Sequence, residues 1–187
     1  MTLQIAAIVE LILGYIVFSL AFSRPASLSK GQKKTVRAPA SRWGIILQTF
    51  GFAFAWAYVR PKGFEKSAPV LVVSMILVPL AVWLAWSAAS HLGKQWRYEA
   101  ALSEGHELIR TGPYRWIRHP IYASMLGLTL ATLAAWTWWP MAIASLVFFL
   151  AGTEVRVRAE DRLLAERFGA EFSEYKKKTR AFIPLLR

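Results

Sequence analysis

Long apolar runs alternate along the chain with shorter polar segments that are mostly basic. The runs cover residues 3–22, 43–59, 68–89 and 121–150. About 20 apolar residues in a helix cross roughly 30 Å of hydrocarbon, so each of the first three runs predicts one transmembrane helix. Pro79 interrupts the third run, but neighbouring helices or water can accommodate a proline inside a span.

The fourth run is too long for one span. Near its middle, residues 136–140 read Trp-Thr-Trp-Trp-Pro, which combines a helix breaker with the aromatic residues typical of a membrane surface. We therefore predict a hairpin of two short spans, 121–135 and 140–152. The expected fold class is all-α: a single polytopic membrane domain, 1–187, with about five transmembrane helices and a cytosolic helical tail.

The distribution of positive charge predicts the orientation. Segments 23–42, 90–120 and 153–187 hold all of the 23 Lys and Arg residues except Arg60, Lys62 and Lys66. Five spans place these three segments on one side, which the positive-inside rule identifies as cytoplasmic. The N-terminus is then expected outside and the C-terminus in the cytoplasm. A net charge of +12 fits a bilayer as partner, and no nucleic-acid-binding motif accompanies it.

Composition supports a membrane protein and excludes several chemistries. The chain is 56% hydrophobic, more than one soluble core of this size needs, and it has no Cys. A disulfide framework, a thiolate metal site and a cysteine nucleophile are therefore excluded. The three His residues are scattered and form no H-E-x-x-H motif, so we expect no metal.

The polar tail after the last span is predicted to be helical. Glycine at 169 should end a helix over 154–168, and a second helix should follow over 170–179. Opposite charges at i,i+4 spacing support the first helix. These pairs are Glu154/Arg158, Arg156/Glu160 and Arg162/Glu166.

Polar residues that can carry chemistry are densest over 104–122, which reads EGHELIRTGPYRWIRHPIY. Gly112 and Pro113 mark a turn, and Pro120 suits the first turn of the fourth span. Arg118 and His119 would then lie at a helix N-terminus, whose N–H groups favour an anionic ligand. A structural explanation, basic membrane anchors beside an aromatic belt, stays open for the same residues.

Two stretches, RTGPYRWIRHPIY and AEDRLLAERFGAEFSEYKKKTRAFIP, resemble the isoprenylcysteine carboxyl methyltransferase family. The similarity covers roughly 92–184 and implies S-adenosylmethionine bound between membrane helices and cytosolic tail, over 92–122 and 153–184. No strand followed by a glycine-rich turn suggests another cofactor fold, so this expectation depends on the resemblance.

The resemblance also implies site residues. We expect the cofactor to be bound by His106, Gly112, Tyr114, His119, Pro120, Tyr122 and Glu160, and the catalytic residues to be Arg156, Glu160 and Arg118. Two positions depart from the family pattern: Ser124 replaces a glycine, and Asp161 replaces the second of two glutamates, which leaves the role of that carboxylate open.

The methyl acceptor is expected to be lipid-like or prenylated, and several chemistries stay open. A carboxylate needs no general base but must be held by Arg, from Arg156 or Arg118. A phospholipid amine or a small thiol needs a base, for which His119 and His106 are the candidates.

A non-catalytic membrane transporter or adaptor is the alternative to an enzyme. Glu10 alone favours it, because an ionisable group inside a span is often functional. For Glu10 and for Gln48, another polar residue inside a span, we favour packing roles.

Overall fold

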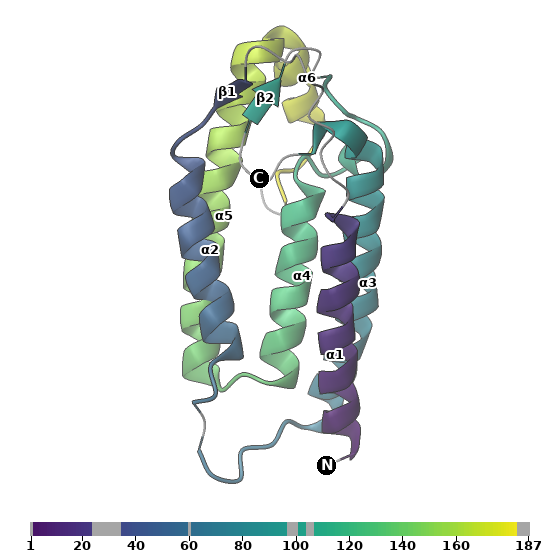
Figure 1. Ribbon diagram of the computed structural model, residues 1–187, viewed down its shortest axis with the longest axis vertical. Coiled ribbons are helices and arrows are strands. Elements are labelled where there is room, and N and C mark those ends of the chain that lie inside the picture. Colours follow the sequence, from purple (N-terminus) through teal and green to yellow (C-terminus); the bar gives the residue numbers. More distant parts are fainter. Residues whose placement is uncertain (1, 24–34, 60, 97–100, 104–106, 183–187) are drawn as a thin grey trace.

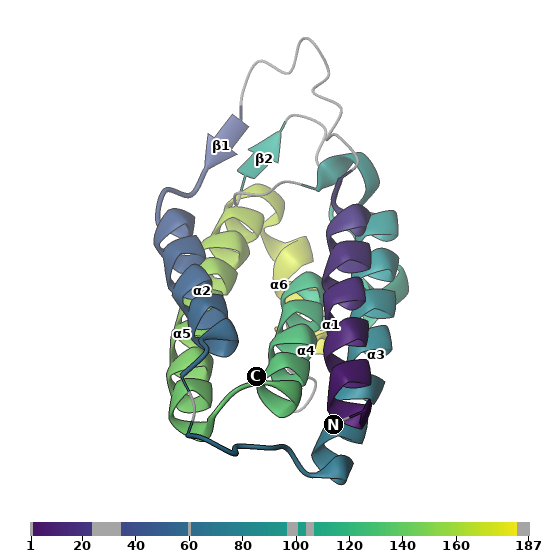
Figure 2. The same ribbon diagram turned by 60° about the horizontal axis from the view of Figure 1, so that its bottom comes forward.

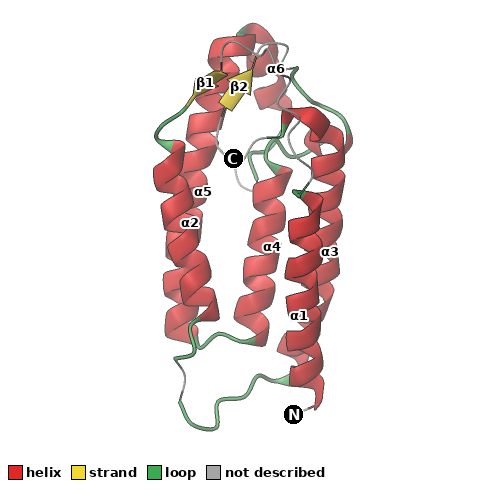
Figure 3. Cartoon of the chain, in the orientation of Figure 1, coloured by secondary structure: helices red, strands yellow, loops and turns green. Residues whose placement is uncertain are grey.

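The computed structural model describes residues 2–23, 35–59, 61–96, 101–103 and 107–182. Five long helices run side by side along the molecule, and a sixth, short helix lies at one end (Figures 1 and 3). The helices are α1 Thr2–Ala21, α2 Ser41–Trp56, α3 Ala68–Leu92, α4 Pro120–Ala135, α5 Trp139–Phe168 and α6 Ala170–Lys178. Single 3₁₀ turns occupy Gly93–Gln95 and Gly112–Arg115.

Helices occur at the predicted places, with one correction at α5. Helices α1 to α4 begin and end within three residues of the predicted spans. The predicted boundary after residue 152 is wrong, because the fifth span and the tail helix form one continuous helix of 30 residues. Gly152, the only weak helix former at that point, packs tightly against α2 and does not end the helix.

The all-α prediction needs one addition, a short β-ribbon at the end that carries α6. Strand β1, Thr35–Arg37, pairs antiparallel with β2, Ala101–Ser103, so that Thr35 lies opposite Ser103. The ribbon joins two of the basic segments that the charge pattern assigned to one side (Figure 1). Three residues per strand are too few to produce a recognisable period-2 pattern in the sequence.

Among the residues that the structure describes, three helices have the length and hydropathy of membrane spans: α1, α3 and α5. Helices α2 and α4 have 16 residues each, which corresponds to about 24 Å. The N-terminus and the α2–α3 and α4–α5 connections lie at the end opposite α6 and the ribbon (Figure 1). The total of five spans and the side that faces the cytoplasm remain predictions.

The helices form two groups, joined by aromatic rings. Helix α2 packs along α5, whereas α1 and α4 pack on α3 (Figure 2). Tyr15 of α1 connects the groups: its ring lies 5.6 Å from that of Trp56 and 6.4 Å from that of Phe52, both on α2. Its hydroxyl lies 2.9 Å from Thr132 Oγ1 on α4.

Glycines allow α2 and α5 to approach closely. A Cβ added at Gly44 would lie 2.4 Å from Arg156 Cγ and 2.7 Å from the Gly152 carbonyl oxygen. A Cβ at Gly152 would lie 2.6 Å from the Gly44 carbonyl oxygen, and one at Gly51 2.8 Å from the Phe149 nitrogen. Small residues of this kind are typical of close helix packing in membranes.

We predict that Gly44→Ala or Gly152→Ala destabilises the protein by about 1–3 kcal/mol, because each new methyl group must push two backbones apart. This loss occurs although alanine favours a helix more than glycine by about 1 kcal/mol. Thermal unfolding in detergent micelles measures the change. Ala53→Val, on the exposed face of α2, is the matched control and should leave the midpoint unchanged. Equal midpoints for all variants would contradict the close contact.

Candidate functional site

The site begins where the residues before α4 meet the end of the chain. Residues Arg118 and His119 donate their backbone N–H groups to the carbonyl oxygens of Arg180 and Ala181, both at 2.8 Å. Arg180 in turn donates its N–H to the Trp116 carbonyl. These two N–H groups, which precede the helix, are therefore not available to hold an anion. The segment after α6 uses them, and by doing so it fixes the start of α4.

The His119 side chain connects α4 to α5. It is buried, and its ring Nε2 lies 2.9 Å from Asp161 Oδ1 and its Nδ1 3.2 Å from Glu160 Oε2. Carboxylates accept and do not donate, so both contacts are satisfied together when both ring nitrogens carry hydrogen. His119 thus has the environment of an imidazolium. Its ring also stacks on Tyr122, with 5.7 Å between ring centroids.

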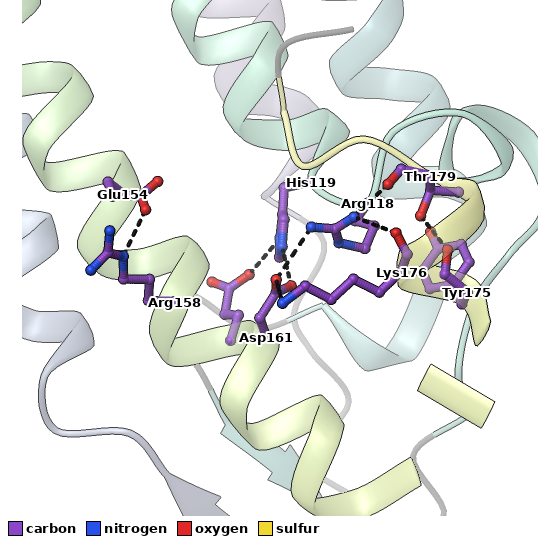
Figure 4. Close-up of polar contacts among 9 residues, drawn as sticks. Arg118, His119, Glu154, Arg158, Asp161, Tyr175, Lys176 and Thr179 are labelled. Atoms are coloured by element: carbon purple, nitrogen blue, oxygen red, sulfur yellow. Dashed lines mark hydrogen bonds and ion pairs between the residues drawn. The ribbon is translucent and has the colours of Figure 1, made fainter. Parts of the chain in front are cut away.

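Asp161 binds two further cations, so that one carboxylate joins three elements. Its Oδ2 lies 3.3 Å from Arg118 Nη2 and 3.3 Å from Lys176 Nζ, which reaches over from α6 (Figure 4). The Arg118 guanidinium also donates to the carbonyls of Lys176 and Thr179. The Arg118 side chain is 3% exposed and that of Asp161 7%, so water screens this ion pair weakly.

The pKa values of the cluster follow from these contacts. Burial alone would lower the pKa of His119, but hydrogen bonds to Asp161 and Glu160 and their charges raise it overall. Burial would likewise raise the pKa of the Glu160 and Asp161 carboxyl groups, but the hydrogen bond and charge of His119 outweigh the effect of burial. The pKa of Glu160 is lowered, helped by Arg156, and that of Asp161 is lowered far, helped by Arg118 and Lys176.

Glu160 differs from Asp161 in exposure. Its side chain is 26% exposed, although it contacts His119 and accepts a hydrogen bond from the Tyr122 hydroxyl. An ionised carboxylate has room for about four hydrogen bonds, so Glu160 retains acceptor capacity on its open side. It is therefore the charged group of the cluster best placed to meet a ligand.

Arg156 lies on the other side of Tyr122. Its guanidinium carbon is 4.8 Å from the centroid of the Tyr122 ring, and its Nη1 donates to Gln48 Oε1 at 2.9 Å. Gln48 in turn donates from Nε2 to Thr153 Oγ1 at 2.8 Å. Helix α2 therefore contributes to the surroundings of Arg156.

The other predicted site residues have these positions. Gly112 begins the 3₁₀ turn with φ +58°, and a Cβ there would lie 2.4 Å from the His91 ring, so two physical constraints require glycine. Tyr114 is buried in the same turn, and Pro120 begins α4 as predicted. His106 lies outside the described residues. The structure thus brings Arg118, His119, Tyr122, Arg156 and Glu160 together.

Sequence reasoning missed several contributors. The sequence marks Asp161 only as a departure from the family pattern, and Lys176 only as one of several basic residues of the tail. Tyr175 donates its hydroxyl to the Tyr114 carbonyl at 2.6 Å; burial raises its pKa to about 12, so the hydroxyl stays a donor at neutral pH. For Gln48, the available signal was an amide inside an apolar span that also contains Gly44 and Gly51.

Comparison with protein families identifies the family of the chain. The profile of the isoprenylcysteine carboxyl methyltransferase family matches residues 72–166, slightly more than half of the chain. The chain belongs to this family. The predicted resemblance is thereby confirmed, and the matched range contains most of α3, all of α4 and the site portion of α5. Together with its three long apolar helices, this makes the chain an integral membrane protein of a family whose methyltransferases use S-adenosylmethionine.

Individual relatives carry different names. The chain is 30% identical over 171 residues to the cobalt-zinc-cadmium resistance protein CzcN of Cupriavidus metallidurans, covering 90% of this chain and 74% of that protein. It is 34% identical over 149 residues to the nickel-cobalt-cadmium resistance protein NccN of Alcaligenes xylosoxydans xylosoxydans, covering 77% and 63%. It is 35% identical over 86 residues to the protein-S-isoprenylcysteine O-methyltransferase of Saccharomyces cerevisiae, covering 43% and 34%.

The described residues include no group of three or more His, Asp or Glu that could hold a metal ion. The expectation of a site without metal stays a prediction, as do the roles of the individual site residues.

The cluster predicts a stability profile with two limbs. The raised pKa of His119 stabilises the fold fully below its ordinary value of 6.5, and this contribution is lost as pH rises through the folded value. The lowered pKa values of Glu160 and Asp161 act oppositely: their contributions are present above 4.5 and 3.8 and are lost as pH falls through the folded values. Thermal unfolding across pH should therefore show losses at both ends.

Asp161→Asn should destabilise the protein by about 3–5 kcal/mol, because Arg118 then stays buried without its carboxylate. It should also move the alkaline loss to lower pH, since the His119 pKa falls. Glu154→Gln, which breaks the exposed pair with Arg158 on the same helix, is the control and should cost only about 0.3–0.5 kcal/mol. An Asp161→Asn profile that coincides with wild type would contradict the cluster's role.

Proposed function

We propose that this protein is a membrane methyltransferase that transfers the methyl group of S-adenosylmethionine to the carboxylate of a lipid-like, prenylcysteine-type acceptor. Family membership supports the reaction class, and the similarity to the yeast enzyme supports the acceptor type. The observation that carries the proposal is the ionised, partly open Glu160 between His119, Tyr122 and Arg156.

The residues around Glu160 fit the cofactor. When bound, S-adenosylmethionine supplies a methyl group on a positively charged sulfur, which an acceptor takes by direct displacement. Glu160 can accept hydrogen bonds from its ammonium or ribose hydroxyl groups, as a carboxylate with spare acceptor capacity does. Tyr114, Pro120 and Tyr122 supply buried apolar surface, and His119 holds the Glu160 carboxylate in place. We also assign Gly112 and His106 to this cofactor region, which spans 92–122 and 153–184.

The state of His119 favours a carboxylate as acceptor. Amine and thiol acceptors must lose a proton and need a general base near neutral pH. His119 has both ring nitrogens against carboxylates and a raised pKa, so it is a poor proton acceptor. A carboxylate attacks without losing a proton, and its catalysis comes from alignment and exclusion of water.

Arg156 is the residue that we assign to the acceptor carboxylate. Of the two candidate arginines, Arg118 has its guanidinium directed to Asp161 and to the carbonyls of Lys176 and Thr179, which gives it a structural task. Arg156 lies against Tyr122 and faces α2, near the apolar helices through which a lipid acceptor arrives. Burying an anion there requires a cation to hold it.

Calorimetric titration of detergent-purified protein with S-adenosylhomocysteine, the expected product, tests the cofactor site. We predict saturable binding by wild type and binding weaker by about 1–3 kcal/mol in Glu160→Gln, which removes the charge that the cofactor's ammonium meets. Glu166→Gln, on the exposed side of the same helix, is the control and should bind like wild type. No binding by folded wild type would refute the enzyme and favour a transporter or adaptor.

Arg156→Met should retain S-adenosylhomocysteine binding and lose methyl transfer to N-acetyl-S-farnesylcysteine by about 10²-fold or more, because the acceptor carboxylate is then neither held nor aligned. Transfer of a labelled methyl group to the extracted lipid measures this. Wild-type rates in Arg156→Met would remove Arg156 from the site. Methylation of phosphatidylethanolamine or of a small thiol, without methylation of the prenylcysteine, would establish the alternative acceptors within the same family.

A further inference from the structure

We propose that Gln48 of α2 is a positioning residue that orients the Arg156 guanidinium toward the methyl acceptor, so that α2 forms part of the catalytic site. The inference rests on the proposed function of Arg156. Gln48 lies outside the range matched by the family profile, 72–166, and no site prediction from the sequence included it.

The hydrogen bonds of Gln48 permit one orientation of its amide. Arg156 can only donate, so the Gln48 atom 2.9 Å from Nη1 is the carbonyl Oε1. The amide nitrogen then donates to Thr153 Oγ1 at 2.8 Å. Thr153 lies one turn before Arg156 on α5. Gln48 is therefore held at both ends, and its oxygen is a fixed acceptor for one nitrogen of the guanidinium.

Burial makes this contact strong enough to direct Arg156. Gln48 is 2% exposed and Arg156 8%, so little water competes for the two side chains. A buried amide that is hydrogen-bonded at both its oxygen and its nitrogen favours one arrangement, because turning it breaks both bonds. The Tyr122 ring, 4.8 Å from the guanidinium carbon, restricts Arg156 from the α4 side. Gln48 and Tyr122 thus fix the plane and position of the guanidinium between them.

The close glycine contacts between α2 and α5 lie next to Gln48 and Arg156. Gly44 lies one turn before Gln48, and a Cβ there would strike Arg156 Cγ at 2.4 Å. A Cβ at Gly152, next to Thr153, would lie 2.7 Å from the backbone nitrogen of Gln48. Without side chains at both glycines, α2 approaches α5 closely enough for a glutamine to reach the guanidinium directly.

The chemistry of the glutamine also suits an anionic acceptor. A carboxylate at position 48 would pair with Arg156 and compete with the carboxylate of the acceptor, whereas a neutral amide orients the guanidinium without adding a negative charge beside it. We therefore expect the pair of Gln48 and Arg156 to favour acceptors that carry a carboxylate.

Kinetics of methyl transfer to N-acetyl-S-farnesylcysteine, combined with titration of S-adenosylhomocysteine, tests the proposal. Gln48→Met, which keeps the volume and removes the hydrogen bonds, should lower kcat/KM for the acceptor by about tenfold or more, since small misplacements at an active site cost up to about 10²-fold. Gln48→Glu should mainly raise the KM for the acceptor. Both variants should bind S-adenosylhomocysteine like wild type, and Thr49→Ala on the exposed face of α2 should match wild type throughout.

A merely structural role predicts a different pattern, in which both Gln48 variants lose cofactor binding and stability together. Unchanged acceptor kinetics in Gln48→Met, with an active wild type, would also overturn the proposal. A double-mutant cycle of Gln48→Met and Arg156→Met, followed by thermal unfolding, should show coupling between the two residues whatever the substrate. The two residues could be coupled while the wild type binds S-adenosylhomocysteine but methylates no acceptor. That result would refute the proposed function and the positioning role together. Additive effects would refute the contact itself.

Discussion

The structure depends on one buried carboxylate, Asp161 of α5, that binds three cations from two other parts of the chain. Ions removed from water destabilise a fold unless each has a partner at close range. Here Arg118, His119 and Lys176 lie within 3.3 Å of Asp161, so the start of α4, the second half of α5 and the end of α6 must stay together. Glycine at 169 with φ +52° turns the chain so that α6 can fold back toward α5.

That constraint divides the polar residues by task. Asp161 is occupied by Arg118, His119 and Lys176, and Arg118 is occupied by Asp161 and two backbone carbonyls. These residues form the rigid part of the site. Glu160, the adjacent residue, shares His119 with Asp161 but remains partly exposed. Arg156 lies one turn earlier on α5 and is directed by α2. Under the proposed function, one helix therefore presents one charge to the cofactor and another to the acceptor, and both groups contact Tyr122.

Much of the fold follows from the sequence, because apolar length, prolines and tryptophans are local signals. Pro120 at the first turn of α4, the break at residues 136–140 and the stop at Gly169 were all predictable. The continuous α5 was not, since only contact with α2 explains why Gly152 does not end the helix. Motif resemblance named Arg118 and His119, but their partners depend on distances between segments over 40 residues apart, which a sequence does not contain. The contact between Gln48 and Arg156 likewise joins segments far apart in the chain, so it could not be predicted from the sequence.

Hydrogen exchange with and without S-adenosylhomocysteine tests most directly whether the junction around His119 and Glu160 holds the cofactor. The account predicts slower exchange in three separated segments, 110–122, 154–163 and 170–182, and unchanged exchange at the opposite end of the bundle, around the α2–α3 and α4–α5 connections. Protection confined to that opposite end, or no protection at a saturating concentration of the ligand, would contradict it.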